Sequence, residues 1–254
     1  MNENYILCEG FHDRAFWAGL LEYLGCVDLR QPGRPPAPIF DPWGLPVRGS
    51  GEYAFHSRRG TFIRIVPCGG RNFIAQFARN RLAIRNQKPL VRLVLNVDAD
   101  TNADGSRAVS PTMSREAMRT LVQEMDPDAT HGGDHDLRLT DGTIVSLVQW
   151  SATQPPSPGL PNQQTLERVA CAAIVAAHPT WAQPVERWLE SRPDPVAAGP
   201  KEYAWSYLAG WFAEYGSYEG FCRAIWGKPA LAAGLVDSLR QSPAWAVADA
   251  VANS

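Results

Sequence analysis

The chain has 254 residues, 45% of them hydrophobic, and a formal net charge of −2 at pH 7. This length suits one large domain or two small ones, and the near-neutral charge excludes an overall basic surface, so contact with nucleic acid would need a local patch. The five cysteines include no Cys-x-x-Cys pair, which argues against a zinc site or a disulfide framework and suits reduced cytoplasm.

The sequence predicts a protein without membrane segments. Its first residues lack the basic start and the long apolar run of a signal peptide. No apolar stretch in the sequence is long enough to cross a bilayer. We therefore expect a cytoplasmic location and no membrane partner.

The N-terminal stretch predicts a strand, a tight turn and a helix. Residues 5–8 form a short apolar run followed directly by Glu9 and Gly10, and a helical pattern begins near Asp13. Glu9 is therefore expected in a strand-to-helix turn, where Gly10 permits a tight bend and Asp13 acts as helix N-cap. If these residues have no function in ligand binding or catalysis, Glu9 is a carboxylate of a surface turn and Asp13 only caps the helix.

An insertion with little regular structure is expected at residues 26–60, which are rich in Pro, Gly and Arg. Within and after it, residues 52–56 and 61–66 flank Arg58-Arg59-Gly60, a pattern typical of a hairpin. Residues 61–66 are also predicted to form a core strand of the main sheet.

A glycine pair follows that strand and precedes a helix expected near residues 72–85. Such a pair exposes backbone N–H groups to an anion, so Gly69, Gly70 and Arg71 are candidates for contact with a phosphate. A plain glycine turn is the alternative.

Basic residues cluster between this helix and the next strand; they are Arg79, Arg81, Arg85, Lys88 and Arg92. A phosphate backbone is one partner for such a cluster, and Arg79 and Arg85 are therefore candidate nucleic-acid-binding residues. A solvated helix face is the alternative.

An apolar, β-branched run at residues 93–97 ends in Asp98 and Asp100, and predicts a buried strand of a parallel sheet. Side chains alternate along a strand, so the two aspartates point the same way if the extended geometry persists that far. Two carboxylates at the C-terminal end of a strand suit a hard cation such as Mg²⁺. A polar loop start is the alternative.

The stretch after these aspartates predicts a loop, a helix and a hairpin. Asp104 lies in the loop, and Ser114 is the expected N-cap of a helix at residues 114–125. Residues 131–136 contain metal-binding residue types, although their glycines suit the approach to a hairpin equally well. Asp141-Gly142 predicts a turn between strands at residues 136–140 and 143–150.

From residue 163 onward the chain is predicted to be helical and is rich in tryptophan. A helix at about residues 163–177 has Glu167 in its first turn, where a carboxylate favours the helix dipole. Lys201 opens a second helix, at residues 201–215, where a cation is unfavourable, so another role is expected for it. The tryptophans are interpreted as core and interface residues, with base stacking as the alternative.

The succession strand, Glu9-Gly10-x-x-Asp13, helix, and a later strand ending in Asp98-x-Asp100 resembles the Toprim domain of topoisomerases, bacterial primases and related nucleases. The resemblance covers roughly residues 5–150. It implies a Rossmann-like α/β fold with a mostly parallel sheet flanked by helices. The implied domains are a Toprim-like catalytic domain at residues 1–150, with the insertion at about 26–60, and a helical C-terminal region at 151–254 packed on it.

The details look most like the Toprim domain of the overcoming-lysogenization-defect (OLD) nucleases and like stand-alone relatives found near bacterial anti-phage genes. This resemblance implies a metal-dependent endonuclease that cleaves DNA or RNA with two Mg²⁺ or Mn²⁺ ions. The implied metal ligands are Glu9, Asp98 and Asp100 for the first ion, and Asp13, Asp104 and Glu167 for the second. The implied catalytic residues are Glu9, Asp13, Asp98, Asp100 and Lys201.

The usual OLD relative has an ATPase domain in the same chain, whereas this sequence contains no Walker motif. We therefore expect a separate ATPase or sensor subunit, or a homo-oligomer, and an effector role in anti-phage defence. The alternative function is a non-catalytic Toprim-like binding or scaffold subunit of a larger complex. The carboxylates favour the nuclease, while the near-neutral charge and the many aromatic residues favour the scaffold.

Overall fold

The structure is a computed structural model that describes residues 2–30, 38–48, 51–102, 113–153, 160, 162–180, 182–191, 193 and 200–254. The chain divides into two compact units. The first unit contains Met1–Val97, Thr112–Val148 and Ala246–Ser254, and the second contains Asp98–Pro111 and Gln149–Trp245. The units therefore interleave along the sequence, whereas the sequence suggested one division near residue 150.

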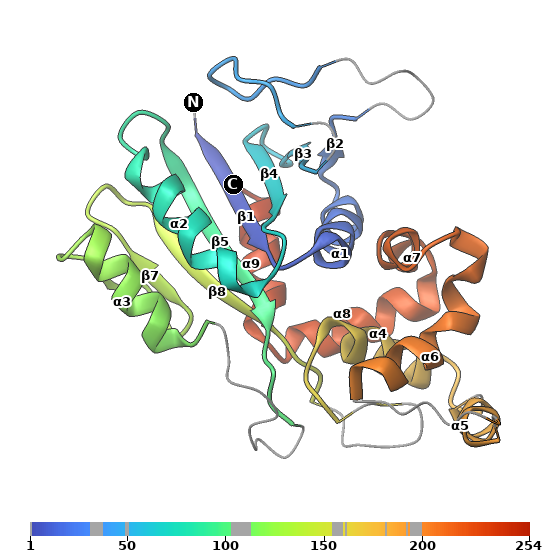
Figure 1. Cartoon of the computed structure of the whole chain (residues 1–254). Helices are drawn as coiled ribbons and strands as arrows, with labels where there is room; N and C mark the ends of the chain where they lie inside the picture. Colours follow the sequence, from blue (N-terminus) through green and yellow to red (C-terminus); the bar gives the residue numbers. More distant parts are fainter. Residues whose placement is uncertain are drawn as a thin grey trace. The chain divides into compact units, whose positions relative to one another are not determined.

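An eight-stranded sheet forms the centre of the first unit, with strand order β2-β3-β4-β1-β5-β8-β7-β6 (Figure 1). Its inner strands β1 and β4 are parallel, as are β1 and β5, while hairpins add antiparallel strands on both sides. The predicted α/β class is confirmed, and the sheet is mixed because of these hairpins. The strands are β1 (Glu3–Cys8), β2 (Val27–Asp28), β3 (Tyr53–His56), β4 (Phe62–Pro67), β5 (Leu90–Asp98), β6 (Thr130–His131), β7 (Asp136–Arg138) and β8 (Ile144–Trp150).

Helices cover both faces of this sheet, because side chains alternate along each strand. On one face, Leu7, Leu93 and Leu95 pack with apolar residues of α2 (Ile74–Ala83) and α3 (Arg115–Met125). On the other face, the indole of Trp17 in α1 (Phe11–Tyr23) donates to the side chain of Asn96. The end of α9 (Pro243–Ala252) is fixed to the same sheet, where Asn4 donates to Ser254.

The start of α1 differs from the prediction. The N-cap is Gly10, and Asp13 lies three residues further on, where its Oδ2 accepts the N–H of Gly10 at 3.0 Å. The prediction of Asp13 as N-cap is therefore wrong, because its carboxylate satisfies the cap residue from inside the helix. The predicted N-cap Ser114 is confirmed, since its hydroxyl accepts the N–H of Ala117 at 3.1 Å.

The histidine- and aspartate-containing run at residues 131–136 leads into a hairpin, because β6 and β7 are antiparallel. Asp136 forms an ion pair with Arg92 of β5 at 3.0 Å. The hairpin interpretation of this run is therefore confirmed. The hairpins predicted around Arg58-Arg59-Gly60 and Asp141-Gly142 are confirmed as well.

The second unit is helical, as predicted. Its helices are α4 (Leu166–Ala177), α5 (Ala182–Glu190), α6 (Pro200–Phe212), α7 (Tyr218–Ala224) and α8 (Pro229–Arg240). Helices α4 and α8 approach closely, since a Cβ atom on Gly234 would lie 3.1 Å from the Cα of Ala173. In the part of the chain that the structure describes, no helix has the length and apolar character to cross a membrane.

Asp126 provides a pH-dependent contribution to the stability of the first unit. Its buried carboxylate accepts the N–H and hydroxyl of Thr140 at 3.0 and 2.8 Å, and pairs with Arg85 at 3.3 Å. Desolvation opposes ionisation, but the bonds from Thr140 and the charge of Arg85 together lower the pKa of Asp126 below its ordinary value. The resulting stabilisation is present above the ordinary pKa and is lost as pH falls through the lowered pKa.

We therefore expect Asp126→Asn to lower the free energy of unfolding by about 1–3 kcal/mol at pH 7. The difference should be smaller at pH 3, because that pH lies below the ordinary pKa of an aspartate, 3.8, where the stabilisation by charge decreases. Urea unfolding at both pH values measures this, with the exposed Asp128→Asn as the control. An equal loss at both pH values would show that charge on Asp126 is irrelevant.

Candidate functional site

In the first unit, Glu9 lies in the turn between β1 and α1 and is half-buried. The neighbouring turn after β4 is fixed to it, because the N–H of Gly70 donates to the carbonyl of Glu9 at 2.8 Å. Gly69 and Gly70 have φ angles of 78° and 127°, which favour glycine at both positions. The N–H of Gly70 is thus engaged within the protein, and a phosphate would have to compete for it.

Two cysteines lie beside the carboxylates of Glu9 and Asp13. Burial raises the pKa of Cys68 to about 12, with further increases from the charges of Glu9 and Asp13. Burial also raises the pKa of Cys8 well above its usual range, with Asp13 adding to the effect. Both thiols are therefore protonated at neutral pH, which makes them poor nucleophiles.

The strand register relates the glutamate to the Asp-x-Asp motif. Cys8 of β1 pairs with Asn96 of β5 in parallel register. Glu9 follows Cys8 directly, and Asp98 is the last residue of β5, two residues beyond Asn96. The side chain of Asn96 is held on both sides, because it accepts from Trp17 at 2.9 Å and donates to the carbonyl of Val148 at 3.3 Å.

In the second unit, the buried carboxylate of Asp98 is bound to the start of α4. Its Oδ1 accepts the N–H of Leu166, the first residue of that helix, at 2.9 Å. Glu167 is the next residue, and its Oε1 accepts the indole N–H of Trp205 in α6 at 3.1 Å. Asp98 therefore bonds the backbone of the N-terminal turn of α4, to which Glu167 also belongs, and the helix dipole there favours negative charge.

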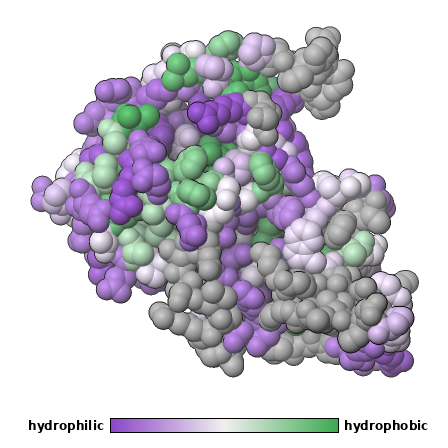
Figure 2. Space-filling model, viewed as in Figure 1, coloured by the Kyte–Doolittle hydropathy of each residue, from purple (hydrophilic) through white to green (hydrophobic). Residues whose placement is uncertain are grey.

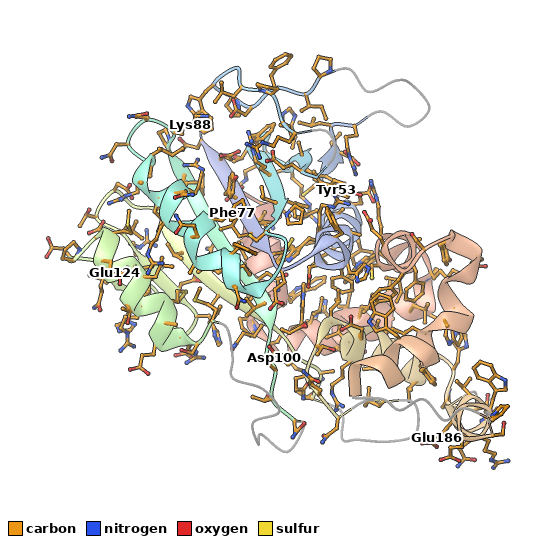
Figure 3. All side chains as sticks on the ribbon, in the orientation of Figure 1. Tyr53, Phe77, Lys88, Asp100, Glu124 and Glu186 are labelled. Atoms are coloured by element: carbon orange, nitrogen blue, oxygen red, sulfur yellow. The ribbon has the colours of Figure 1, made fainter. Side chains whose placement is uncertain are left out.

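Asp100 is also in the second unit, and its side chain is shown in Figure 3. Its φ angle is 54°, a left-handed conformation that is uncommon for a residue other than glycine. Its N–H donates to the carbonyl of Gln164 at 3.1 Å, and its Oδ1 accepts from the side chain of Gln163 at 3.0 Å. The extended geometry therefore ends at Asp98, so strand alternation does not fix the direction of the Asp100 side chain.

Asp104 and Lys201 are the remaining predicted site residues. Asp104 lies outside the described residues. Lys201 is the second residue of α6, four positions before Trp205. Within the described ranges, no three or more His, Cys, Asp or Glu side chains form a group that could hold a metal ion. The metal site implied by the resemblance to Toprim domains therefore stays a prediction.

The members of the predicted basic cluster form ion pairs with carboxylates in the first unit. Arg79 pairs with Glu124 at 2.9 Å, and Arg85 pairs with Asp141 at 3.0 Å. Arg81 and Arg92 are buried, which excludes a fully solvated face. Over α2 and α3, Figure 2 shows hydrophilic residues interspersed with hydrophobic ones. A phosphate that bound Arg79 or Arg85 would have to displace a carboxylate.

Three side-chain amides that form hydrogen bonds near Asp98 and Asp100 were not predicted from the sequence: those of Asn96, Gln163 and Gln164. Asn96 interrupts the apolar run of β5, and a polar residue at a central strand position was the available signal. Gln164 holds the chain after β8, because its side chain both accepts from and donates to the backbone of Ala152, at 2.8 and 3.0 Å. Its neighbour Gln163 bonds Asp100, and no local pattern in the sequence marks either glutamine.

Comparisons with known proteins establish the fold alone. The sequence matches no protein-family model and no curated protein. The crystal structure of hypothetical protein PH0156 from Pyrococcus horikoshii OT3 is similar, with a TM-score of 0.66, 14% identity and 99% of each chain covered. A protein of unknown function from Thermoplasma acidophilum has a TM-score of only 0.26, with 12% identity over 85% of this chain and 89% of its own.

Proposed function

We propose that the chain is a Toprim-type, divalent-metal-dependent nuclease that cleaves phosphodiester bonds in DNA or RNA. The observation that carries the proposal is the register of β1 with β5, in which Glu9 and Asp98 come at the ends of neighbouring parallel strands. In open α/β sheets, ligands bind outside the carboxyl ends of the strands. Three acids from two strand ends, with Asp100 following Asp98, supply the ligand chemistry for such a site.

The available donors suit Mg²⁺ or Mn²⁺, because they are carboxylate oxygens. We assign the first ion to Glu9, Asp98 and Asp100. A second ion would use Glu167, which directly follows the Leu166 that Asp98 bonds at the start of α4, together with Asp13 and Asp104. Such ions activate water and neutralise charge on the leaving oxygen. Lys201 is proposed to stabilise the negative charge that develops on the phosphate.

The proposed setting is a bacterial anti-phage defence assembly in the cytoplasm. Because the sequence has no Walker motif, the ATPase or sensor would be a separate subunit, and self-association is a second way to assemble. A non-catalytic scaffold is the competing function. It is favoured by the ion pairs of Arg79 and Arg85, which occupy basic side chains that a nuclease would use.

A cleavage assay distinguishes the two functions. The purified chain would be incubated with supercoiled plasmid, single-stranded DNA circles and single-stranded RNA, with Mg²⁺, Mn²⁺ or a chelator. Cleavage that depends on metal and is absent from Asp98→Asn would support the nuclease. Absence of cleavage of every substrate, with or without its partner subunits, would contradict the nuclease and favour the scaffold.

Two exposed aromatic side chains beside Glu9 support a nucleic acid substrate. Phe11 and Phe73 are 50% and 53% exposed and follow the turns after β1 and β4, which the Gly70–Glu9 bond joins. The guanidinium of Arg14 lies 4.8 Å from the ring centre of Phe11. The exposed ring of Phe11, which lies beside this cation, and the exposed ring of Phe73 suit stacking with unpaired bases, which favours a single-stranded substrate.

We expect the double change Phe11→Ala and Phe73→Ala to weaken binding of single-stranded DNA at least about thirtyfold, because each of the two stacked bases contributes ~1–3 kcal/mol. Fluorescence anisotropy of a labelled oligonucleotide would measure this, in an Asp98→Asn background that prevents cleavage. Phe40→Ala is the control, since Phe40 is equally exposed but outside these turns. Equal affinities for the double variant and the control would contradict the stacking role.

A further inference from the structure

The first unit contains a cavity of about 420 Å³ that the proposed nuclease site does not use. Residues of α2, of β1 and β4, and of the ranges 41–48 and 51–52 line it. Its apolar walls are Tyr5, Leu45, Phe77 and Ile84. The volume lies in the range of sites for small organic ligands.

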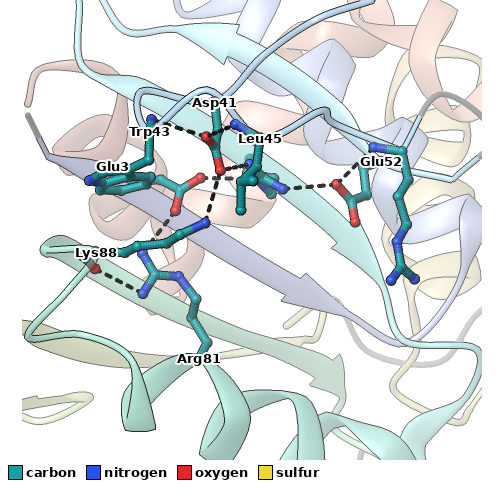
Figure 4. A network of polar contacts seen from close by, with 9 residues as sticks. Glu3, Asp41, Trp43, Leu45, Glu52, Arg81 and Lys88 are labelled. Atoms are coloured by element: carbon teal, nitrogen blue, oxygen red, sulfur yellow. Dashed lines mark hydrogen bonds and ion pairs between the residues drawn. The ribbon is translucent and has the colours of Figure 1, made fainter.

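A buried network of charges fixes one wall of this cavity (Figure 4). Arg64 of β4 pairs with Glu3 at 3.0 Å, with Asp41 at 2.9 Å and with Glu52 at 3.1 Å. Asp41 and Glu52 belong to the predicted insertion, so Arg64 binds two points of that insertion to the sheet. The wall is therefore preformed, which reduces the entropy lost when a ligand binds.

Two further cations complete this network. Arg81 of α2 pairs with Glu3 at 2.9 Å, and Lys88 pairs with Asp41 at 3.3 Å. The three cations Arg64, Arg81 and Lys88 thus balance the three carboxylates. Figure 3 labels two residues that line the cavity: Phe77, which belongs to its apolar wall, and Lys88, which forms its cationic rim.

Arg48 also lines the cavity, and it does not belong to this charge network. The side chain of Arg48 is exposed, and among the described residues it forms no ion pair or hydrogen bond. Asn80 of α2 also lines the cavity; its side-chain oxygen accepts from Gln76 at 2.9 Å, so its amide N–H₂ can donate. The cavity therefore offers a net positive charge and an amide donor beside an apolar wall.

We propose that this cavity binds a nucleoside monophosphate. The base would lie against Phe77, Leu45 and Ile84, and the phosphate would meet Arg48, Asn80 and the rim ammonium of Lys88. Phosphate groups prefer arginine and lysine, while a base supplies the apolar surface that these walls match. The inference does not depend on the proposed nuclease activity, because the cavity shares no residue with that site.

Isothermal titration calorimetry with adenosine monophosphate tests the proposal on the full-length protein. We expect saturable binding of the nucleotide, and at least about tenfold weaker binding of adenosine and of inorganic phosphate, which each lack half of the interactions. Arg48→Glu, which reverses the free charge, and Asn80→Trp, which narrows the cavity, should each weaken nucleotide binding about tenfold or more.

The control is Arg59→Glu, an exposed arginine of the same unit that does not line this cavity. It should bind the nucleotide as the wild type does. Absence of nucleotide binding, phosphate binding as tight as the nucleotide, or wild-type affinity in both Arg48→Glu and Asn80→Trp would overturn the proposal. An equal loss in Arg59→Glu would also overturn it, because the effect would then be general charge.

Discussion

Replacing Arg64 with methionine is expected to lower the free energy of unfolding by about 3–5 kcal/mol at pH 7. The change leaves the buried carboxylates of Glu3 and Asp41 and the half-buried carboxylate of Glu52 without their shared guanidinium. Removing one partner of a buried network is costly, because the remaining charges stay desolvated. Urea unfolding followed by tryptophan fluorescence would measure the loss.

The matched control is Arg79→Met, which removes an ion pair whose side chains are 41% and 48% exposed. An exposed pair of this kind contributes only about 0–1 kcal/mol. If Arg64→Met were no more destabilising than this control, the network would be irrelevant to the stability of the first unit.

Acid should partly rescue Arg64→Met. Burial raises the pKa of Glu3 above its ordinary value in the wild type, despite its pairs with Arg64 and Arg81. Loss of Arg64 should raise that pKa further. Proton uptake by Glu3 then favours the folded state as pH falls, so the variant should recover stability between neutral and acidic pH.

Asp98→Asn is expected to reduce cleavage at least about a hundredfold while the fold stays intact. The asparagine side-chain oxygen can still accept the N–H of Leu166, but it lacks the negative charge that a metal ligand needs. Plasmid nicking and thermal melting on the same preparation would measure both effects.

Asp98→Ala tests the structural role of Asp98 in addition to its proposed role in cleavage. It removes the acceptor at the start of α4 and should cost about 1 kcal/mol of stability in addition to activity. Full activity in Asp98→Asn would remove the proposed mechanism. An unfolded Asp98→Asn would mean that the aspartate is structural.

Local sequence patterns predicted the core strands and several helix ends. The apolar runs at residues 5–8, 61–66, 92–96 and 143–148 all became strands of the sheet. Ser114 was identified as an N-cap because capping depends on residues only three positions apart. The strand order was not predictable, since pairing depends on contacts between segments far apart in the sequence.

The errors and omissions in the predicted site also arise from contacts between segments that lie far apart in the sequence. Asp100 is left-handed because its N–H reaches the carbonyl of Gln164, a contact that no local pattern reveals. The basic residues near Arg79 were recognisable as charges, but their carboxylate partners on other segments were not. Arg64 was visible as a charge within an apolar strand, while its partner Asp41 lies in a segment that showed no regular pattern.

Calorimetric titration with Mn²⁺ is the most direct test of the central claim, that Glu9 and Asp98 share one metal ion. The titration would compare the wild type with Glu9→Gln, Asp98→Asn and the double variant. If both acids bind the same ion, each single change should weaken binding about tenfold or more, and their effects should be non-additive in the double variant. Wild-type Mn²⁺ affinity in both single variants would contradict the claim.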